Sequence, residues 1–400
     1  MTAGRGTGTT GSSRLPASIW ALGLVSLFMD MSSELVHALL PVFLVTTLGA
    51  SMLSVGIIEG IAEATASITK VFSGLVSDWI GKRKLLAVAG YGLAALTKPL
   101  FPLATTIDTV LAARFIDRVG KGIRGAPRDA LVADLVAPAQ RGAAYGLRQA
   151  LDTAGAVAGP LLAILFMSIF ADRIRTVFWI ATLPAILAVV ILILAVREPE
   201  RPHMEAAPRA PFRLADLKGL GRPYWEVVAV GAVLTLARFS EAFLVLRAQG
   251  TGLAVTYVPL VMVVMSGVYT LAAYPAGLLA DRLDRRSLLA FGFVPLIVAD
   301  IVLGEATSPI TVFCGVAFWG LHMGLTQGLL ATLVAGASPA ALRGSAFGLF
   351  NFASGIVLLA ASVIAGALWQ NYGPAVTFYA GAAITGAGLA GLVIVNRRRS

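Results

Sequence analysis

The chain has few of the residue types from which catalytic and metal sites are usually built. It holds one cysteine, Cys314, and three histidines among 400 residues, which excludes an internal disulfide and leaves no cysteine pair for a zinc site. Because Cys314 lies in an apolar run, we expect it to be a small packing residue. A phosphate-binding glycine loop, HExxH, GxSxG and CxxC are also absent. These absences argue against an enzyme, against a bound cofactor and against ATP as a direct energy source.

Charged residues are scarce as well, at 13% of the chain against 58% hydrophobic residues, and the mean hydropathy is +0.84. This is more apolar sequence than a soluble core can bury, so the chain belongs in lipid. A helix needs roughly 20 apolar residues to cross the hydrocarbon layer. The sequence predicts an all-α integral membrane protein with helices near residues 17–46, 52–77, 85–105, 108–136, 143–170, 174–196, 225–247, 255–280, 288–305, 309–336, 344–369 and 373–395.

The net charge of +10 comes from basic residues that gather on one side of these predicted helices. Nineteen lysines and arginines lie in segments assigned to the side of both termini, and three lie on the other side: Arg173, Arg175 and Arg247. Basic loops are typical of the cytoplasmic side. We therefore expect a multi-pass protein of the plasma (inner) membrane with both termini cytoplasmic, a lipid partner and no nucleic-acid partner.

A glycine-aspartate-basic block occurs twice, as "GLVSDWIGKRKLLA" from Gly74 and, 203 residues later, as "GLLADRLDRRSLLA" from Gly277. A second pair, "RGAAYGL" from Arg141 and "RGSAFGL" from Arg343, repeats with an offset of 202. The twelve helices therefore form two six-helix halves. The predicted organisation is a flexible cytoplasmic tail (1–16), an N-terminal half (17–196), a cytoplasmic linker (197–224), a C-terminal half (225–396) and a basic cytoplasmic tail (397–400).

The repeated block, with the twelve spans, resembles the loop 2-3 motif of the major facilitator superfamily of secondary transporters. The residues that carry this resemblance are Gly74, Asp78, Gly81, Lys82, Arg83 and Lys84 in the first copy and Gly277, Asp281, Arg285 and Arg286 in the second. Asp284 stands where the second copy should have a glycine. Near a helix end, Asp78 can cap a neighbouring helix or pair with an arginine across the halves, as the resemblance also implies. Such contacts would stabilise one of the conformations between which a transporter alternates. The alternative is that the loop only fixes the orientation of the helices in the membrane.

Ionisable residues inside the predicted helices are costly in lipid and usually face a cavity. They follow single helix faces in the first, second and fourth helices, and the stripe on the fourth spans about 120°. A carboxylate that faces a cation can exchange a proton as a cavity opens and closes. The proton-coupling candidates are Asp30, Glu34, Glu59 and Glu63, with Asp30 and Glu34 as first choices. The substrate-cavity candidates are His37, Arg114, Asp117, Arg118, Lys121, Arg124, Arg238, Glu241 and His322.

Alternatives remain open for these charges. The carboxylates can form permanent ion pairs with the fourth helix, and either histidine can be a hydrogen-bonded packing residue. The basic stripe can bind an anionic substrate, neutralise the acids of helices one and two, or reach the headgroups at its cytoplasmic end. Glu34 and Glu241 can face each other across the cavity, from helices one and seven.

The fifth predicted helix contains Gly146, Gly155, Gly159 and Pro160. This pattern resembles the helix-5 motif that the superfamily associates with antiporters, mostly drug exporters, although the glycines expected after Pro160 are missing. Gly155 and Gly159 would let another helix approach closely, and Pro160 would leave a bend. The alternative is a small-residue packing face.

We therefore expect a proton-coupled secondary transporter that exports a small drug-like or organic solute by alternating access, driven by the proton gradient. Alternatives are an importer or exchanger of an anionic organic solute, which the basic stripe favours, and a divalent metal exporter, for which no strong ligand set is visible. A non-transporting membrane sensor is a remote alternative. We expect a small-molecule substrate as partner and a monomeric chain.

Overall fold

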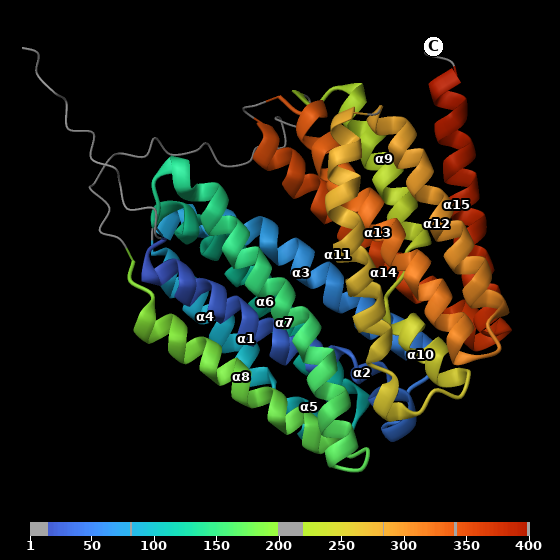
Figure 1. Cartoon of the computed structure of the whole chain (residues 1–400), viewed down its shortest axis with the longest axis horizontal. Coiled ribbons are helices and arrows are strands. Elements are labelled where there is room, and N and C mark those ends of the chain that lie inside the picture. Colours follow the sequence, from blue (N-terminus) through green and yellow to red (C-terminus); the bar gives the residue numbers. More distant parts are fainter. Residues whose placement is uncertain (1–14, 81, 199–218, 283, 340–341, 398–400) are drawn as a thin grey trace, which may run out of the picture.

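The structure is a computed structural model that describes residues 15–80, 82–198, 219–282, 284–339 and 342–397. All regular elements in these ranges are helices (Figure 1). The first half comprises α1 (Ala17–His37), α2 (Leu40–Val42), η1 (Phe43–Thr47), α3 (Met52–Ile80), α4 (Arg83–Thr97), α5 (Leu100–Leu103), α6 (Ile107–Asp134), η2 (Pro138–Gln140), α7 (Arg141–Ile169) and α8 (Ile174–Ala195). The second half comprises α9 (Arg222–Ala237), α10 (Ala242–Gly250), η4 (Val255–Tyr257), α11 (Leu260–Arg282), α12 (Arg285–Glu305), α13 (Pro309–Ala337), α14 (Arg343–Tyr372) and α15 (Pro374–Arg397).

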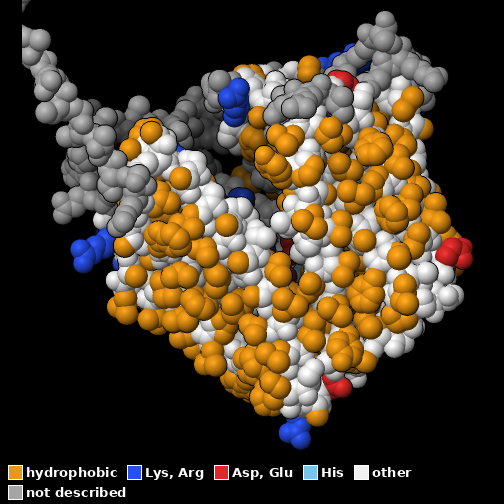
Figure 2. Space-filling view, in the orientation of Figure 1, with side chains coloured by type: hydrophobic (Ala, Val, Ile, Leu, Met, Phe, Trp, Pro, Cys, Tyr) orange, Lys and Arg blue, Asp and Glu red, His pale blue; other side chains and the backbone are white. Residues whose placement is uncertain are grey.

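These helices make twelve long segments, which confirms the all-α fold class predicted from the hydropathy. Eleven of the segments in the described ranges are long and apolar enough to cross a membrane. The remaining one is α6, which has the same length but carries the basic stripe, so its charges must be shielded by neighbouring helices. On the face that Figure 2 shows, hydrophobic side chains cover much of the surface between the helix ends, as a surface in contact with lipid requires.

Segments one and seven are interrupted at corresponding places, which the sequence prediction of continuous helices missed. In segment one, α1 ends at His37, and a turn, α2 and the π-helical η1 follow. In segment seven, α9 ends at Ala237 and α10 begins at Ala242, so residues 238–241 form a non-helical break. Broken helices in matching positions of two repeats are typical of substrate sites in secondary transporters.

The two halves share one hydrophobic core at the end away from the termini and have separate cores at the end near them. The shared core includes Phe43, Phe178, Phe243 and Trp319, which come from both halves. Near the termini, one cluster contains only first-half residues, and two others contain only second-half residues. The halves therefore meet at one end and diverge at the other, and Figure 2 shows a hollow between them.

The contact between α3 and α14 crosses the two halves and depends on glycine. A Cβ placed on Gly56 would stand 2.2 Å from the carbonyl oxygen of Ser362, and one on Gly366 would stand 2.5 Å from the carbonyl oxygen of Met52. The two backbones touch here without intervening side chains. Near the same end of α3, the backbone N–H of Leu53 donates a hydrogen bond to Gln370 Oε1 at 3.3 Å.

A second contact between the halves lies in the loops at the closed end. Thr256 Oγ1, in η4, donates a hydrogen bond to Asp172 Oδ1 in the loop between α7 and α8. Ala171 and Asp172 have φ values of 48° and 60°, in the left-handed region that residues other than glycine rarely adopt. The local backbone therefore carries strain at the residue that bonds the other half.

Packing of α7 against α1 gives a testable role to the glycines of the fifth helix. A Cβ on Gly155 would stand 2.2 Å from the carbonyl oxygen of Leu27, whereas one on Gly146 would meet nothing within 4 Å. We expect Gly155→Ala to lower the free energy of unfolding by about 1–3 kcal/mol, the usual cost of overpacking. Thermal denaturation of the detergent-purified protein measures this change. Gly146→Ala is the matched control, and equal melting temperatures for the two variants would contradict the close packing.

The repeated blocks are only partly visible in the described structure. Gly81 lies outside the described residues, as do the side chains of Asp78, Asp281, Arg285 and Arg286, so the role predicted for Asp78 stays a prediction. Gly74 packs near Ala126 of α6, Gly277 is exposed, and exposed Lys82 directly precedes α4. Asp284 caps α12 by accepting a hydrogen bond from the backbone N–H of Ser287 at 2.9 Å. The aspartate that replaces the expected glycine thus begins a helix.

Candidate functional site

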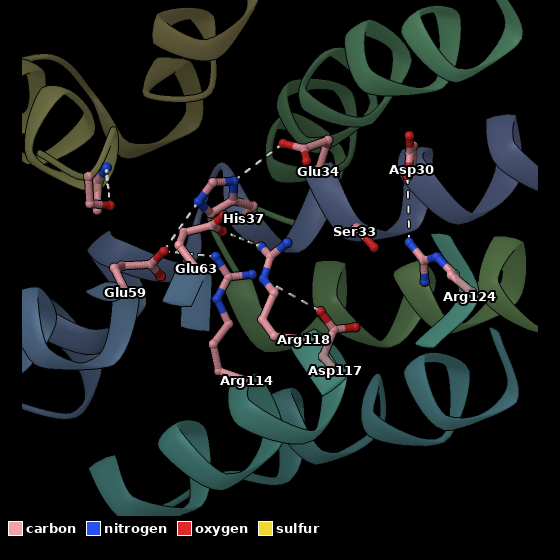
Figure 3. A network of polar contacts seen from close by, with 12 residues as sticks. Asp30, Ser33, Glu34, His37, Glu59, Glu63, Arg114, Asp117, Arg118 and Arg124 are labelled. Atoms are coloured by element: carbon pink, nitrogen blue, oxygen red, sulfur yellow. Dashed lines mark hydrogen bonds and ion pairs between the residues drawn. The ribbon is translucent and has the colours of Figure 1, made fainter. Parts of the chain in front are cut away.

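A cavity of about 250 Å³ lies between the two halves, beside the break in segment seven. Its walls come from α1, α3 and α6 on one side and from the break and α14 on the other. Figure 3 shows the first-half side chains that converge here. The cavity is lined by Glu34, His37, Glu59, Glu63, Arg118, Lys121, Arg238, Phe239, Ser240, Glu241 and Leu358. The structure therefore brings eight of the predicted site residues to one place, including Glu34 and Glu241 from opposite halves.

His37 joins two of the cavity carboxylates. Its Nδ1 lies 3.3 Å from Glu34 Oε2, and its Nε2 lies 3.5 Å from Glu59 Oε2. Glu59 Oε2 also accepts a hydrogen bond of 2.8 Å from Arg114 Nη2 on α6. Glu34 is the most accessible of this group, with 21% of its side chain exposed, whereas those of Glu59 and Arg114 are 1% and 2% exposed. His37 therefore links the more accessible Glu34 to the buried Glu59–Arg114 pair.

A second group of contacts continues along α6. Arg118 Nη2 lies 3.4 Å from Glu63 Oε1 on α3. Asp117 accepts a hydrogen bond of 2.9 Å from Lys98 Nζ, which also donates to Ser33 Oγ at 3.1 Å. Sequence reasoning missed Lys98, although its position inside a predicted span was the available signal. These pairs shield most of the α6 stripe from lipid.

Three charged residues at the cavity wall are left without such partners. Within the described ranges, Lys121, Arg238 and Glu241 form no ion pair within 4 Å. Lys121 comes from α6, whereas Arg238 and Glu241 are the first and last residues of the break in segment seven. Unpaired charges of both signs around one small cavity can bind the charged groups of a solute.

Gly159 fixes where Glu34 stands. A Cβ on Gly159 would lie 2.9 Å from the Cβ of Glu34 and 2.7 Å from the carbonyl oxygen of Met31. The backbone of α7 therefore presses directly on the turn of α1 that carries the carboxylate. Pro160 follows inside α7 without ending the helix.

Several predicted residues lie away from the cavity wall. Asp30 is near Arg124, with 3.8 Å between Oδ1 and Nη2, and Arg124 stacks over Tyr91. Arg114, Asp117 and Arg124 form buried pairs behind the wall, as described above. His322 is buried with its Nδ1 2.7 Å from the carbonyl oxygen of Gly292, so the packing alternative describes its contacts. These residues do not line the cavity because of the rotation of each helix about its axis, which sequence spacing does not determine.

Arg128 directly follows Pro127 on α6. In the structure α6 continues through Pro127. Arg128 approaches Asp129 at 3.1 Å and Asp152 of α7 at 3.7 Å, and Arg148 lies 3.5 Å from Asp152. This group lies toward the termini, where the halves diverge.

A larger hollow of about 520 Å³ lies at the closed end and is lined in part by Thr46, Asp172 and Arg175. Arg175 donates a hydrogen bond of 2.6 Å to the carbonyl oxygen of Pro102 and stacks on Phe43. The charge of Arg175 stabilises these local contacts, and the hollow does not reach the charged network of α1, α3 and α6. The smaller cavity is therefore the candidate site.

The family model described as Major Facilitator Superfamily matches residues 22–247 and 227–400. The chain belongs to the major facilitator superfamily. It is 30% identical over 376 residues to an uncharacterized MFS-type transporter of Methanocaldococcus jannaschii, with 92% of each chain covered. Multidrug resistance protein MdtH of Cronobacter sakazakii is 32% identical over 133 residues, which is 32% of this chain and 31% of that protein.

Solved major facilitator structures confirm the fold. The nucleoside transporter NupG superimposes with a TM-score of 0.81 at 13% identity, covering 94% of this chain and 99% of that one. A bacterial homolog of the human lysosomal transporter Spinster, in an inward-facing and occupied conformation, gives a TM-score of 0.77 at 15% identity, with 95% and 96% covered. The chain is thus a multi-pass membrane transporter of the major facilitator superfamily.

Proposed function

We propose that this major facilitator protein is a proton-coupled secondary transporter that exports a small organic solute by alternating access. The observation that carries this proposal is the cavity between the halves, where Glu34 lies beside unpaired charges and next to a broken helix. The cavity lies where halves that are joined at one end diverge toward the other. This arrangement supports a carrier that exposes one site to each side of the membrane in turn.

Glu34 is the first candidate for the proton-coupling residue. It is reached from the cavity, bonded to His37 and linked through it to the buried Glu59–Arg114 pair. A solute group that binds near Glu34 competes with its proton, so solute and proton occupy the site in alternation. Asp30 is the second candidate, because it lies beside Arg124 between the cavity and the diverging ends.

The export direction rests on the fifth-helix motif, Gly146 to Pro160, and on the partial likeness to multidrug resistance proteins. We assign both termini to the cytoplasm from the basic loops and place the protein in the plasma membrane as a monomer. The structure described here would then open toward the cytoplasm and accept its cargo from that side.

Import or exchange of an anionic organic solute is the second candidate. The unpaired cations Lys121 and Arg238 at the cavity wall favour it. No observation favours a metal exporter, since no group of three or more His, Cys, Asp or Glu side chains that could hold a metal is found where side chains are described.

The test uses purified protein in liposomes that contain a pH-sensitive dye. Drug-like cations, nucleosides and organic anions are supplied one at a time under a solute gradient, and proton movement is recorded. We expect Glu34→Gln to abolish solute-driven proton movement while solute binding, measured by thermal shift, remains. Asp108→Asn is the matched control, because Asp108 is an exposed carboxylate in the first turn of α6.

Two results would reject these assignments. Unchanged proton movement in both Glu34→Gln and Asp30→Asn would overturn the coupling residues. Solute movement without proton movement in the unmodified protein would overturn proton coupling itself. Affinity for an organic anion that falls in Lys121→Ala and Arg238→Ala would favour the second candidate.

A further inference from the structure

The second half contains a carboxylate that is buried without a counterion among the described residues. Asp300, in α12, is 0% exposed, and neither carboxyl oxygen has a hydrogen-bond partner among the described residues. An ionised carboxylate without a partner is strongly destabilised in such a place. A buried group in this position takes up a proton instead.

The surroundings of Asp300 contain an acceptor that also lacks a donor. A Cβ on Gly381 of α15 would stand 2.6 Å from Asp300 Oδ2 and 3.3 Å from the carbonyl oxygen of Ala237. Both oxygens therefore border the same glycine, which leaves room for the carboxyl group. Ala237 is the last residue of α9, and no donor in the described parts of the chain reaches its carbonyl. When Asp300 is protonated, its carboxyl O–H is a donor for the carbonyl oxygen of Ala237.

Most charged and titratable groups on the neighbouring helices are bound elsewhere. Arg247 of α10 donates to the carbonyl oxygens of Leu303, Gly304 and Ala306 at the end of α12. His322 of α13 bonds Gly292, and Tyr379 of α15 bonds Glu305. Tyr269 of α11 and Arg238, which follows Ala237, complete this set, and Arg238 lines the cavity. None of these groups makes an ion pair or a hydrogen bond with Asp300 within the described structure.

We infer that Asp300 is a proton-binding site, separate from the cavity carboxylates, whose proton controls the conformation of the break in segment seven. With the proton bound, the carboxyl O–H lies next to the free carbonyl at the end of α9. When the proton leaves to water, an anion remains beside that carbonyl and one residue from Arg238. The carbonyl is repelled and the guanidinium is attracted, so Arg238 turns from the cavity toward α12.

This site goes beyond the proposed function, since a proton can bind at Asp300 whatever the chain transports. It also gives the second half a titratable group beside the residue that precedes the break. The cavity carboxylates, in contrast, come mainly from the first half. Protonation at Glu34 and at Asp300 would then act on the two broken segments separately.

The first experiment compares infrared difference spectra of the purified full-length protein between acidic and alkaline buffers. We expect a C=O band of a protonated carboxyl group in an apolar environment, which Asp300→Asn removes and Asp108→Asn leaves unchanged. In Gly381→Ala the band should shift, because the added methyl group displaces the carboxyl group. A band that persists unchanged in Asp300→Asn would overturn the proton site.

The second experiment follows thermal denaturation against pH. If the folded state holds a proton at Asp300 that the unfolded state releases, stability is complete at low pH and falls as the pH rises. This fall in stability should be absent in Asp300→Asn and in Asp300→Leu. The leucine variant is included in case the asparagine variant folds poorly, because a buried apolar residue needs no partner. The same decline in all three proteins would contradict the inference.

The third experiment tests control of the break. Ser240→Cys in a Cys314→Ser background places a single thiol at the cavity wall within the break. Its rate of labelling by a water-soluble thiol reagent should change with pH when Asp300 is present and stay constant after Asp300→Asn, once both rates are corrected for thiolate content. Identical pH dependence in both proteins would overturn control by Asp300. None of the three experiments depends on transport, so their failure is distinguishable from failure of the proposed function.

Discussion

Replacing Arg114 with alanine is expected to lower the free energy of unfolding by about 3–5 kcal/mol, the usual cost of leaving one member of a buried ion pair alone. Arg114 and Glu59 have 2% and 1% of their side chains exposed, and 2.8 Å separates the bonded atoms. Glu59 Oε1 has no hydrogen-bond partner among the described residues. Without Arg114 the carboxylate would depend on His37 alone, at 3.5 Å.

Denaturation in detergent, followed by circular dichroism, measures this loss. The double variant Glu59→Gln/Arg114→Leu removes both charges, and we expect it to regain most of the stability. The control is Arg222→Ala, because Arg222 pairs with Glu226 while 87% of its side chain is exposed. A surface pair of this kind contributes about 0–1 kcal/mol. Equal losses for Arg114→Ala and Arg222→Ala would contradict the structural role of the buried pair.

Joining the two halves at the closed end by a disulfide is expected to reduce transport to the level of protein-free liposomes. The side chains of Asp172 and Thr256 are in hydrogen-bond contact across the halves, so Asp172→Cys/Thr256→Cys places two thiols within reach of each other. In the proposed alternating-access mechanism, the halves separate at this end for cargo to leave. A covalent link at the closed end keeps the cavity open only toward the diverging ends of the halves.

The matched experiment uses a Cys314→Ser background, because Cys314 is free and exposed. This exposure differs from the packing role that its apolar run predicted, since apolar side chains of a membrane helix also face lipid. Oxidation should stop transport in the double variant and leave each single variant active, and reduction should restore it. Undiminished transport by protein whose disulfide is verified by mass would refute separation of the halves at this end.

The fold could be predicted because membrane helices are encoded locally. Each apolar run is long enough to cross the bilayer, and the repeated blocks at Gly74 and Gly277 divide the chain into two comparable halves. The break at residues 238–241 could not be read in this way. Its short polar run lies between apolar stretches that together have the length of one helix, so hydropathy alone joins them.

The candidate site was predictable as a set of residues and not as a set of pairs. Helical spacing placed Glu34, His37, Glu59 and Glu63 on single faces, and the structure brings these faces together. Which arginine pairs with which acid depends on the rotation and depth of α6 against α3, and that is a property of packing. Lys98 is a single charge in its stretch of sequence, so it had no periodic neighbours to draw attention to it.

The contact between α3 and α14 has a consequence for how the protein moves. Because Gly56 and Gly366 bring bare backbones together, few interlocked side-chain rotamers depend on the angle between these helices. Rotation about this line therefore breaks little packing, in contrast to rotation that opens the shared core around Phe43 and Trp319. The free-energy barrier to reorientation should accordingly arise at the closed end, while α3 and α14 serve as the axis. Bulky substitutions along that axis would slow turnover more than they weaken solute binding.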